Sequence, residues 1–322
     1  MTLLRCTIYS LFITTLSVGT SLAFSAVPTS PAPVSPSHPA TPSARAYLKG
    51  INANQFRHPL DRDLTSFFKE APLNGIAEDA IRRTLAVVEQ GVRLDLLSSS
   101  VKVSEKQLPN LHASMLEACR VLDLDTPVEL YVQSNPQANA FTLALQGPET
   151  APIVVVTSAL LDRCTEEEVQ AIIGHELGHL KCEHSLYLTL GGLASTPLRA
   201  LPILGAQADS LLQRWRLAAE YSCDRAAMLV SQDVSVVAGA MLKLFAGTSR
   251  ATNTQAFIDQ ALEYEKLLKS ANPLVRASIQ RQQRTHPLPV NRVAELQKWA
   301  DSKEYKTILE KAAQSDDNDG KE

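Results

Sequence analysis

The residues best suited to chemistry in this chain lie in one short motif, His175-Glu176-Leu177-Gly178-His179. On a helix, positions i and i+4 lie one above the other, so the imidazoles of His175 and His179 could bind the same metal ion. Glu176 would be rotated by about 100° from His175, which places its carboxylate beside the ion instead of on it. There it could take a proton from a water molecule whose pKa a zinc ion lowers to about 7. The motif therefore predicts a catalytic zinc site, provided that these residues are helical.

The residues around the motif have the pattern of an amphipathic helix that begins near Thr165. Thr165 and Glu168 form a capping box, and acidic residues fill the first turn. Apolar residues then recur at helical spacing, namely Val169, Ile172, Ile173, Leu177 and Leu180. Ala171, Gly174 and Gly178 form a smooth strip on another side, where a second backbone could approach closely. We expect a helix whose histidines flank its buried face and border a cleft.

A second helical run, residues 217–227, carries a pair of carboxylates. Glu220 and Asp224 are at i and i+4, where two carboxylates repel each other unless a cation or hydrogen-bond donors compensate. A zinc ion bound by Glu220, with Asp224 accepting a hydrogen bond from a ligand histidine, would remove this repulsion. A solvated acidic patch paired with Arg216 or Arg225 is the alternative, and without the upstream motif it would be favoured. With that motif, we predict Glu220 as the third metal ligand and Asp224 as its supporting residue.

These motifs, in this order and spacing, resemble the HtpX-like and CAAX-prenyl-protease-type zinc metallopeptidases. The resemblance rests on H-E-L-G-H at 175–179, on His184 five residues further along, and on E-x-x-C-D at 220–224. It implies a gluzincin with an α+β, mainly helical fold and a small sheet packed beside the H-E-x-x-H helix. It also implies one zinc ion per chain, bound by two histidines and one glutamate. Cys182 and Cys223 stand where many members carry other small or polar residues.

Further stretches extend the resemblance over roughly residues 56–300. Asn139-Ala140-Phe141 resembles a strand that lies over the cleft in that family, and Thr285-His286-Pro287 with Arg292 resembles its C-terminal H-P…R element. The first implies that substrate main chain binds at residues 139–141 by β-augmentation, and the second that His286 hydrogen-bonds the oxyanion of the tetrahedral intermediate. An ordinary sheet strand and a structural histidine are the alternatives. His58–Asp61 and Val103–Pro109 resemble the plastid and cyanobacterial branch.

The cysteines raise the question of a second metal site. Cys182, His184 and Cys223 could bind a soft metal ion. On a helical wheel, however, Cys182 falls near the histidine face whereas His184 does not, and the chain has no C-x-x-C pair. We therefore expect packed cysteines and a structural histidine. Together with Cys119 and Cys164, these cysteines do not have the spacing of a disulfide framework, which favours a reducing compartment.

Length and composition suit one large domain. The chain has 322 residues, of which 45% are hydrophobic, enough for a sizeable core. A net charge of −3 without a notable basic tract argues against nucleic acid as a partner. We predict a metallopeptidase domain at 56–312 and a disordered polar tail at 313–322. Helical patterns lie near 61–70, 76–97 and 108–122, short strands are expected at 128–132, 141–145 and 153–157, and only helix and loop follow Thr165.

The N-terminal region has the composition of targeting sequence. Residues 1–23 carry one early positive charge and an uncharged apolar run that ends in the small-residue cleavage pattern Ser21-Leu22-Ala23. Residues 24–55 contain no acidic residue, and residues 24–43 are rich in Pro and Ser, which predicts a disordered transit or linker region at 24–55. A signal peptide followed by Phe24 resembles the bipartite presequences of algae with secondary plastids. We expect a plastid address, with secretion or an endomembrane location as the alternative.

An apolar segment at 186–208 separates the two helices that carry the predicted ligands. It is about long enough to span a bilayer. Pro197 and Pro202 interrupt it, and Arg199 would be costly at the centre of a membrane. We expect a buried or interfacial hairpin, and attachment to a membrane surface stays open.

The sequence as a whole predicts a zinc-dependent metalloendopeptidase. The resemblance implies peptides or unfolded proteins as substrates, in protein quality control. The alternative is a catalytically weak, zinc-stabilised, membrane-associated chaperone or scaffold, which the intact Glu176 argues against because a scaffold needs no general base. Prenyl-peptide processing is a weaker third option, since the chain lacks the many membrane spans of those proteases. The sequence does not predict an oligomeric state.

Overall fold

The computed structural model describes residues 46–70, 74–143, 151–250, 252–282 and 286–319. The predicted signal peptide at 1–23 and most of the predicted linker at 24–55 lie outside these ranges. Within them the chain is mainly helical with a single sheet, as predicted. The elements before the sheet are a 3-10 turn at Ala53–Gln55 and the helices α2 (Pro59–Lys69) and α3 (Asn74–Ser99).

The sheet has four strands in the order β1-β2-β4-β3. They are β1 (Ser100–Lys102), β2 (Glu129–Gln133), β3 (Ala140–Leu143) and β4 (Ile153–Thr157). Strands β2 and β4 are parallel, and the two outer pairings are antiparallel. Three of these strands match the predicted ones to within two residues, whereas the short β1 was not predicted.

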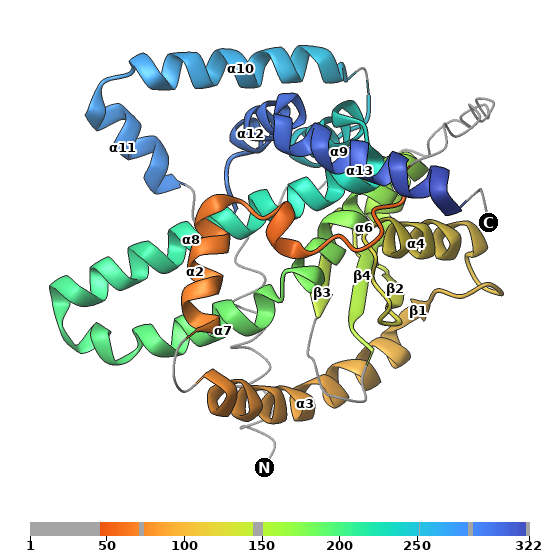
Figure 1. Cartoon of the computed structure of the whole chain (residues 1–322), viewed down its shortest axis with the longest axis horizontal. Helices are drawn as coiled ribbons and strands as arrows, with labels where there is room; N and C mark the ends of the chain where they lie inside the picture. Colours follow the sequence, from red (N-terminus) through yellow and green to blue (C-terminus); the bar gives the residue numbers. More distant parts are fainter. Residues whose placement is uncertain (1–45, 71–73, 144–150, 251, 283–285, 320–322) are drawn as a thin grey trace. The chain divides into compact units, whose positions relative to one another are not determined.

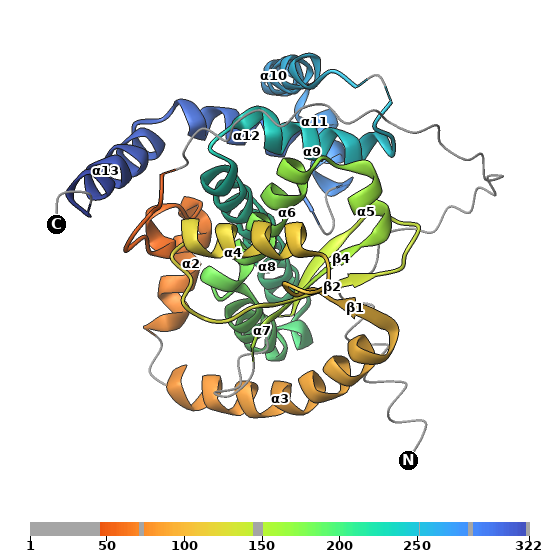
Figure 2. The same ribbon diagram turned by 90° about the vertical axis from the view of Figure 1, so that its right-hand side faces the viewer.

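The sheet is covered on both faces, which explains the uninterrupted apolar run of β4. All five residues of β4 are buried. Val154 and Val156 belong to the main core with α4 (Pro109–Val121) and α6 (Glu166–Lys181), while Ile153 and Val155 pack with Leu96 of α3. Figure 2 shows α3 below the sheet and α4 and α6 above it. A short helix, α5 (Ser158–Arg163), connects β4 to α6.

Helix α6 begins as its capping pattern predicts. The Thr165 hydroxyl accepts a hydrogen bond from the backbone N–H of Glu168, and the Glu168 carboxylate accepts one from the backbone N–H of Thr165 at 2.8 Å. The predicted small-residue strip of α6 packs against α8 (Pro202–Ser231). A Cβ atom on Gly178 would lie 2.8 Å from Ala226 Cβ and 3.0 Å from Cys223 Cα. Glycine therefore lets the two helices approach closely enough to share a site.

The remaining helices lie after α8 and complete the fold. They are α9 (Val234–Ala246), α10 (Thr254–Ser270), α11 (Pro273–Gln282), α12 (Pro289–Asp301) and α13 (Lys303–Asp319). Helix α13 continues to Asp319, so the stretch predicted to be a disordered tail from residue 313 is helical for most of its length.

The folded part of the chain also begins before the predicted boundary at residue 56. Leu48 and Ile51 are buried in the main core. Backbone groups of Ala46 exchange hydrogen bonds with the Gln232 side chain, and Gly50 N–H donates to Asp123. Low acidity and a Pro/Ser-rich neighbourhood hid this segment from sequence analysis, because its two apolar anchors are too few to form a periodic pattern.

The apolar segment 186–208 forms a helical hairpin. Helix α7 (His184–Ser195), a 3-10 turn at Pro197–Ala200 and the first half of α8 follow one another (Figure 1). The base of the hairpin is anchored by a small core of its own, made of Leu186, Tyr187, Leu190, Leu212 and Trp215. In the described part of the chain, no helix is both long enough and apolar enough to cross a membrane.

Candidate active site

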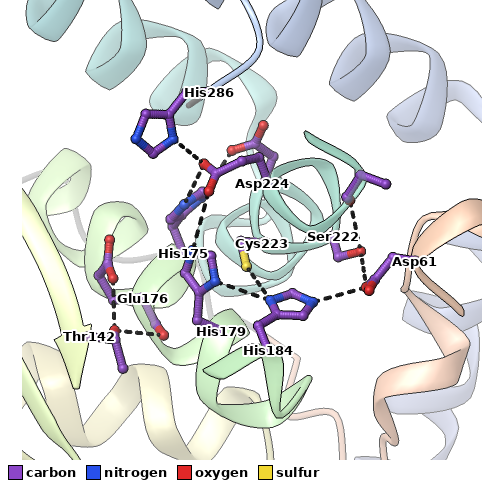
Figure 3. A network of polar contacts seen from close by, with 12 residues as sticks. Asp61, Thr142, His175, Glu176, His179, His184, Ser222, Cys223, Asp224 and His286 are labelled. Atoms are coloured by element: carbon purple, nitrogen blue, oxygen red, sulfur yellow. Dashed lines mark hydrogen bonds and ion pairs between the residues drawn. The ribbon is translucent and has the colours of Figure 1, made fainter. Parts of the chain in front are cut away.

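Three side chains from α6 and α8 converge on one point. His175 Nε2 lies 3.6 Å from Glu220 Oε2, and His179 Nε2 lies 3.7 Å from Glu220 Oε1. The two imidazoles lie one turn apart on α6 and meet edge to face, with ring centroids 5.2 Å from each other. Glu220 reaches them from α8 because Gly178 allows the close helix contact. Figure 3 shows His175 and His179 of α6 beside Cys223 and Asp224 of α8. The structure thus brings together the three predicted metal ligands.

The donor set fits a zinc ion. A tetrahedral zinc ion with bonds of roughly 2.0–2.1 Å separates its donor atoms by about 3.3–3.4 Å, close to the separations of the histidine and glutamate atoms. Glu220 is 7% exposed, and its Oε2 is buried and takes no hydrogen bond, although His286 Nδ1 lies 2.9 Å away as an ion-pair partner. A buried carboxylate oxygen with an unused lone pair between two imidazoles is suited to a cation.

The protonation of the two histidines differs because their neighbours differ. Burial alone would lower the pKa of His175, but the neighbouring carboxylates of Asp224 and Glu220 raise it to about 9. Burial lowers the pKa of His179 to about 3, so this imidazole is neutral. Burial would raise the pKa of Glu220, but the neighbouring imidazoles of His175 and His286 hold it well below its usual value. Glu220 is therefore an anionic carboxylate, and the neutral His179 imidazole beside it is a nitrogen donor.

Asp224 supports His175 from the side away from the proposed ion. His175 Nδ1 lies 3.0 Å from Asp224 Oδ1, so the ring can keep its Nε2 directed at Glu220. Arg292 of α12 donates to both carboxylate oxygens of Asp224, from Nε at 2.8 Å and from Nη2. The alternative partner Arg225 instead donates to backbone carbonyls, those of Phe56 and Arg57. Arg292 is thus the cation that compensates Asp224.

The Glu176 side chain points toward the sheet and lies on the other side of His175 from Asp224. Thr142 of β3 donates a hydrogen bond from Oγ1 to Glu176 Oε2 at 2.7 Å (Figure 3). Glu176 is buried, and this burial raises its pKa although His175 and Thr142 act against the shift. A carboxylate with a raised pKa is a better proton acceptor at neutral pH than an exposed one.

The predicted substrate strand is an edge strand. Ala140 and Phe141 belong to β3, which pairs on one side with β4 and, within the described residues, with no strand on the other. Asn139 precedes β3 and joins it to Thr157 through backbone and side-chain hydrogen bonds. Because Thr142 on β3 contacts the Glu176 carboxylate, the strand runs beside the proposed proton acceptor.

The structure corrects the sequence analysis of His184. That analysis placed His184 off the histidine face by continuing the helix beyond residue 181. Helix α6 ends at Lys181, and Glu183 adopts a left-handed conformation with φ of 52°. The chain turns back, and His184 Nδ1 lies 3.1 Å from His179 Nδ1. His184 therefore contacts a predicted ligand directly.

Two further residues at the site were missed by sequence analysis. Thr142 carried no signal beyond its place in a strand pattern. Asp61 was quoted only as part of the stretch His58–Asp61, yet it is fully buried behind His184. Cys223, which the sequence analysis noted as a departure from the family, has its thiol within 4.8 Å of both predicted ligand histidines, and burial raises the pKa of this thiol. It lies beneath the site as a neutral side chain.

The fold, together with a helix that carries two histidines one turn apart, defines a metallopeptidase. The chain belongs to peptidase family M48, whose family model matches residues 105–300. It is 37% identical over 272 residues to plastoglobule-localized metallopeptidase 48, chloroplastic, of Arabidopsis thaliana, covering 82% of this chain and 78% of that protein. The predicted resemblance to HtpX-like metallopeptidases is thereby confirmed.

Two microbial relatives match a shorter stretch. The protease HtpX homolog of Moorella thermoacetica is 35% identical over 105 residues, 32% of this chain and 34% of that protein. Protease HtpX homolog 2 of Methanosarcina acetivorans is 34% identical over 94 residues, 29% of this chain and 31% of that protein.

Proposed function

We propose that this metallopeptidase is a zinc-dependent endopeptidase with Glu176 as its general base. His175, His179 and Glu220 would hold the ion, and the convergence of their donor atoms at 3.6 and 3.7 Å is the observation that carries the proposal. When bound, zinc supplies Lewis acidity that polarises the scissile carbonyl and the attacking water. Glu176 takes a proton from that water and returns it to the leaving amine.

The neighbouring residues prepare this chemistry. Thr142 holds the Glu176 carboxylate by its hydrogen bond, and Asp224 with Arg292 fixes the orientation of His175. The edge of β3 offers backbone groups to an extended peptide, which supports peptides and unfolded proteins as substrates in a quality-control role. His286, 2.9 Å from Glu220, is the imidazole that would donate to the developing oxyanion.

Removal of the metal ion tests this function. The purified protein should contain one zinc ion per chain and hydrolyse casein. Treatment with 1,10-phenanthroline should abolish the hydrolysis, and added zinc should restore it, whereas the non-chelating 1,7-isomer should have no effect. Full hydrolysis by protein shown to be metal-free would contradict the proposal.

The hairpin of α7 and α8 supports a further part of the proposal, association with a lipid surface. Beyond its anchored base, the hairpin exposes large apolar side chains, namely Leu193, Leu201, Ile203, Leu204 and Leu211. Ile203 is 74% exposed. Side chains of this kind on a projecting helix bind to a lipid interface because the contact removes their apolar surface from water.

We expect the protein to float with phosphatidylcholine vesicles. Replacement of Leu193, Ile203 and Leu204 by serine should release it, because the apolar surface at the tip is lost, and should leave hydrolysis of a soluble peptide unchanged. The matched control replaces three exposed apolar residues elsewhere, Leu267, Leu274 and Val275. Equal flotation of both triple variants would refute the role of the hairpin.

A plastid location is the last part of the proposal. The targeting pattern at residues 1–55 supports it, as does the chloroplast location printed in the name of the Arabidopsis relative. Because the described fold begins at residue 46, the fusion to test is residues 1–45 ahead of a fluorescent protein. We expect import into the plastid, and loss of import with Phe24→Ala. Secretion of both fusions would contradict a plastid address.

A further inference from the structure

A series of buried, hydrogen-bonded side chains leads from His179 to the N-terminal helix α2. His179 Nδ1 lies 3.1 Å from His184 Nδ1, and His184 Nε2 lies 3.0 Å from Asp61 Oδ2 (Figure 3). His184 is 2% exposed and Asp61 is fully buried. These hydrogen bonds connect His179, a predicted metal ligand, to the Asp61 carboxylate. Asp61 has no role in the mechanism proposed above.

Asp61 is held as a carboxylate by several donors. The Ser222 hydroxyl donates to its Oδ2 at 2.7 Å, Trp215 Nε1 donates to its Oδ1 at 3.0 Å, and Arg57 is an ion-pair partner at 3.7 Å. Burial alone would raise the pKa of Asp61, but His184, Arg57 and Ser222 hold it well below its usual value. An ionised carboxylate only accepts hydrogen bonds, so the proton in the contact with Asp61 belongs to His184 Nε2.

The proton on His184 Nε2 determines where the other protons lie between Asp61 and His179. An imidazole that carries its single proton on Nε2 presents Nδ1 as an acceptor. The contact at 3.1 Å then requires the proton on His179 Nδ1, and His179 Nε2 keeps its lone pair. This is the nitrogen that lies 3.7 Å from Glu220 Oε1. If His184 instead gave a proton to His179, the proton of His179 would sit on Nε2 and block metal binding.

We propose that His184 and Asp61 form a positioning relay that fixes His179 in the tautomer whose Nε2 binds the metal ion. The inference rests on the proposed zinc site and deepens it. Each ligand histidine then has its own carboxylate: Asp224 contacts His175 directly, and Asp61 acts on His179 through an intervening imidazole. Partners of this kind orient ligand rings, and their loss typically costs roughly 10–100-fold in metal affinity.

A second metal ion at the relay is the competing interpretation. Oxygen, sulfur and nitrogen atoms of Asp61, Cys182 and His184 lie within 4.8 Å of one another. However, His184 and Asp61 already face each other in a hydrogen bond, and the Arg57 guanidinium stands beside the carboxylate and donates to the Cys182 carbonyl. A cation there would displace a hydrogen bond and meet a buried positive charge.

The test compares variants of the full-length protein by zinc affinity, measured in competition with a chromophoric chelator. Asp61→Asn offers an amide that can donate to His184 and so reverse the relay, while His184→Phe removes the acceptor and keeps an aromatic ring. Both should weaken zinc binding roughly 10–100-fold. His184→Gln retains an acceptor for His179 and should bind zinc nearly as the wild type does.

A matched control separates this role from a loss of stability. Glu168→Gln makes the same carboxylate-to-amide change at another buried carboxylate, which pairs with the half-buried Lys243 away from the imidazoles. It should lower the melting temperature while leaving zinc affinity unchanged. Long-range ¹H–¹⁵N spectra of histidine-labelled, metal-free protein should show the His179 proton on Nδ1 in the wild type and on Nε2 in Asp61→Asn.

The outcomes are distinct. Unchanged zinc affinity in Asp61→Asn and His184→Phe, equal loss in His184→Gln and His184→Phe, or two zinc ions per wild-type chain would each overturn the relay. If the wild-type protein binds zinc and hydrolyses casein, and Asp61→Asn and His184→Phe bind zinc equally well, the relay is refuted but the proposed function is not. A wild-type protein without zinc affinity would instead overturn the proposed function itself.

Discussion

Glu176→Gln should retain one zinc ion per chain and lose nearly all hydrolysis. The amide has the shape of the carboxylate and can still accept the hydrogen bond from Thr142, but it cannot take a proton. The contribution of a general base is about 10²–10⁴-fold in rate, so we expect kcat to fall by that factor. His175, His179 and Glu220 are untouched, so metal content should not change.

Steady-state hydrolysis of a fluorogenic peptide and metal analysis of the same preparation measure both quantities. Wild-type turnover by Glu176→Gln would refute the role of general base. The experiment also addresses the scaffold alternative, because a catalytically weak scaffold would show little hydrolysis in the wild type and no difference in the variant.

Glu220→Gln should lose both zinc and activity. The substitution removes the only predicted anionic ligand and leaves a neutral amide between His175 and His179. We expect zinc affinity to fall further than the roughly 10–100-fold that loss of a supporting residue costs, and hydrolysis to recover only partly in excess zinc. Glu263→Gln, which changes an exposed carboxylate of α10, is the matched control.

This pair of results separates binding from chemistry. Excess zinc should help Glu220→Gln, because its defect is occupancy, and should not help Glu176→Gln, because its site is already filled. Full zinc occupancy in Glu220→Gln at stoichiometric metal would show that another residue is the third ligand. Cys223, whose thiol lies near both histidines, would then be the next candidate.

Local sequence patterns predicted the parts of the site that lie on single helices. The capping box set the start of α6, the i and i+4 spacing paired His175 with His179, and the same spacing paired Glu220 with Asp224. The small-residue strip on α6 predicted a close neighbour, and the structure identifies α8 as that neighbour. Such features depend on the geometry of one helix, which the sequence encodes directly.

The contacts of His184 and Asp61 could not be predicted in this way. His184 reaches His179 because the chain reverses at Glu183, a non-glycine residue in a left-handed conformation that carries no sequence signal. Asp61 lies far upstream, and only the packing of α2 against α8 brings it to Ser222. Thr142 likewise depends on the sheet meeting α6. Each of these contacts is tertiary, so helical periodicity and strand alternation say nothing about it.

The close packing of α6 on α8 also frees the outer part of the helical hairpin, residues 193–211, for evolutionary change. The two helices meet where Gly178 faces Ala226, and the core at the base of the hairpin separates this contact from residues 193–211. Natural selection can lengthen, shorten or recharge that outer stretch while the catalytic geometry is inherited intact. The outer part of the hairpin and the catalytic site can thus diverge independently, and an engineer who wished to give the protease an attachment site would graft it there.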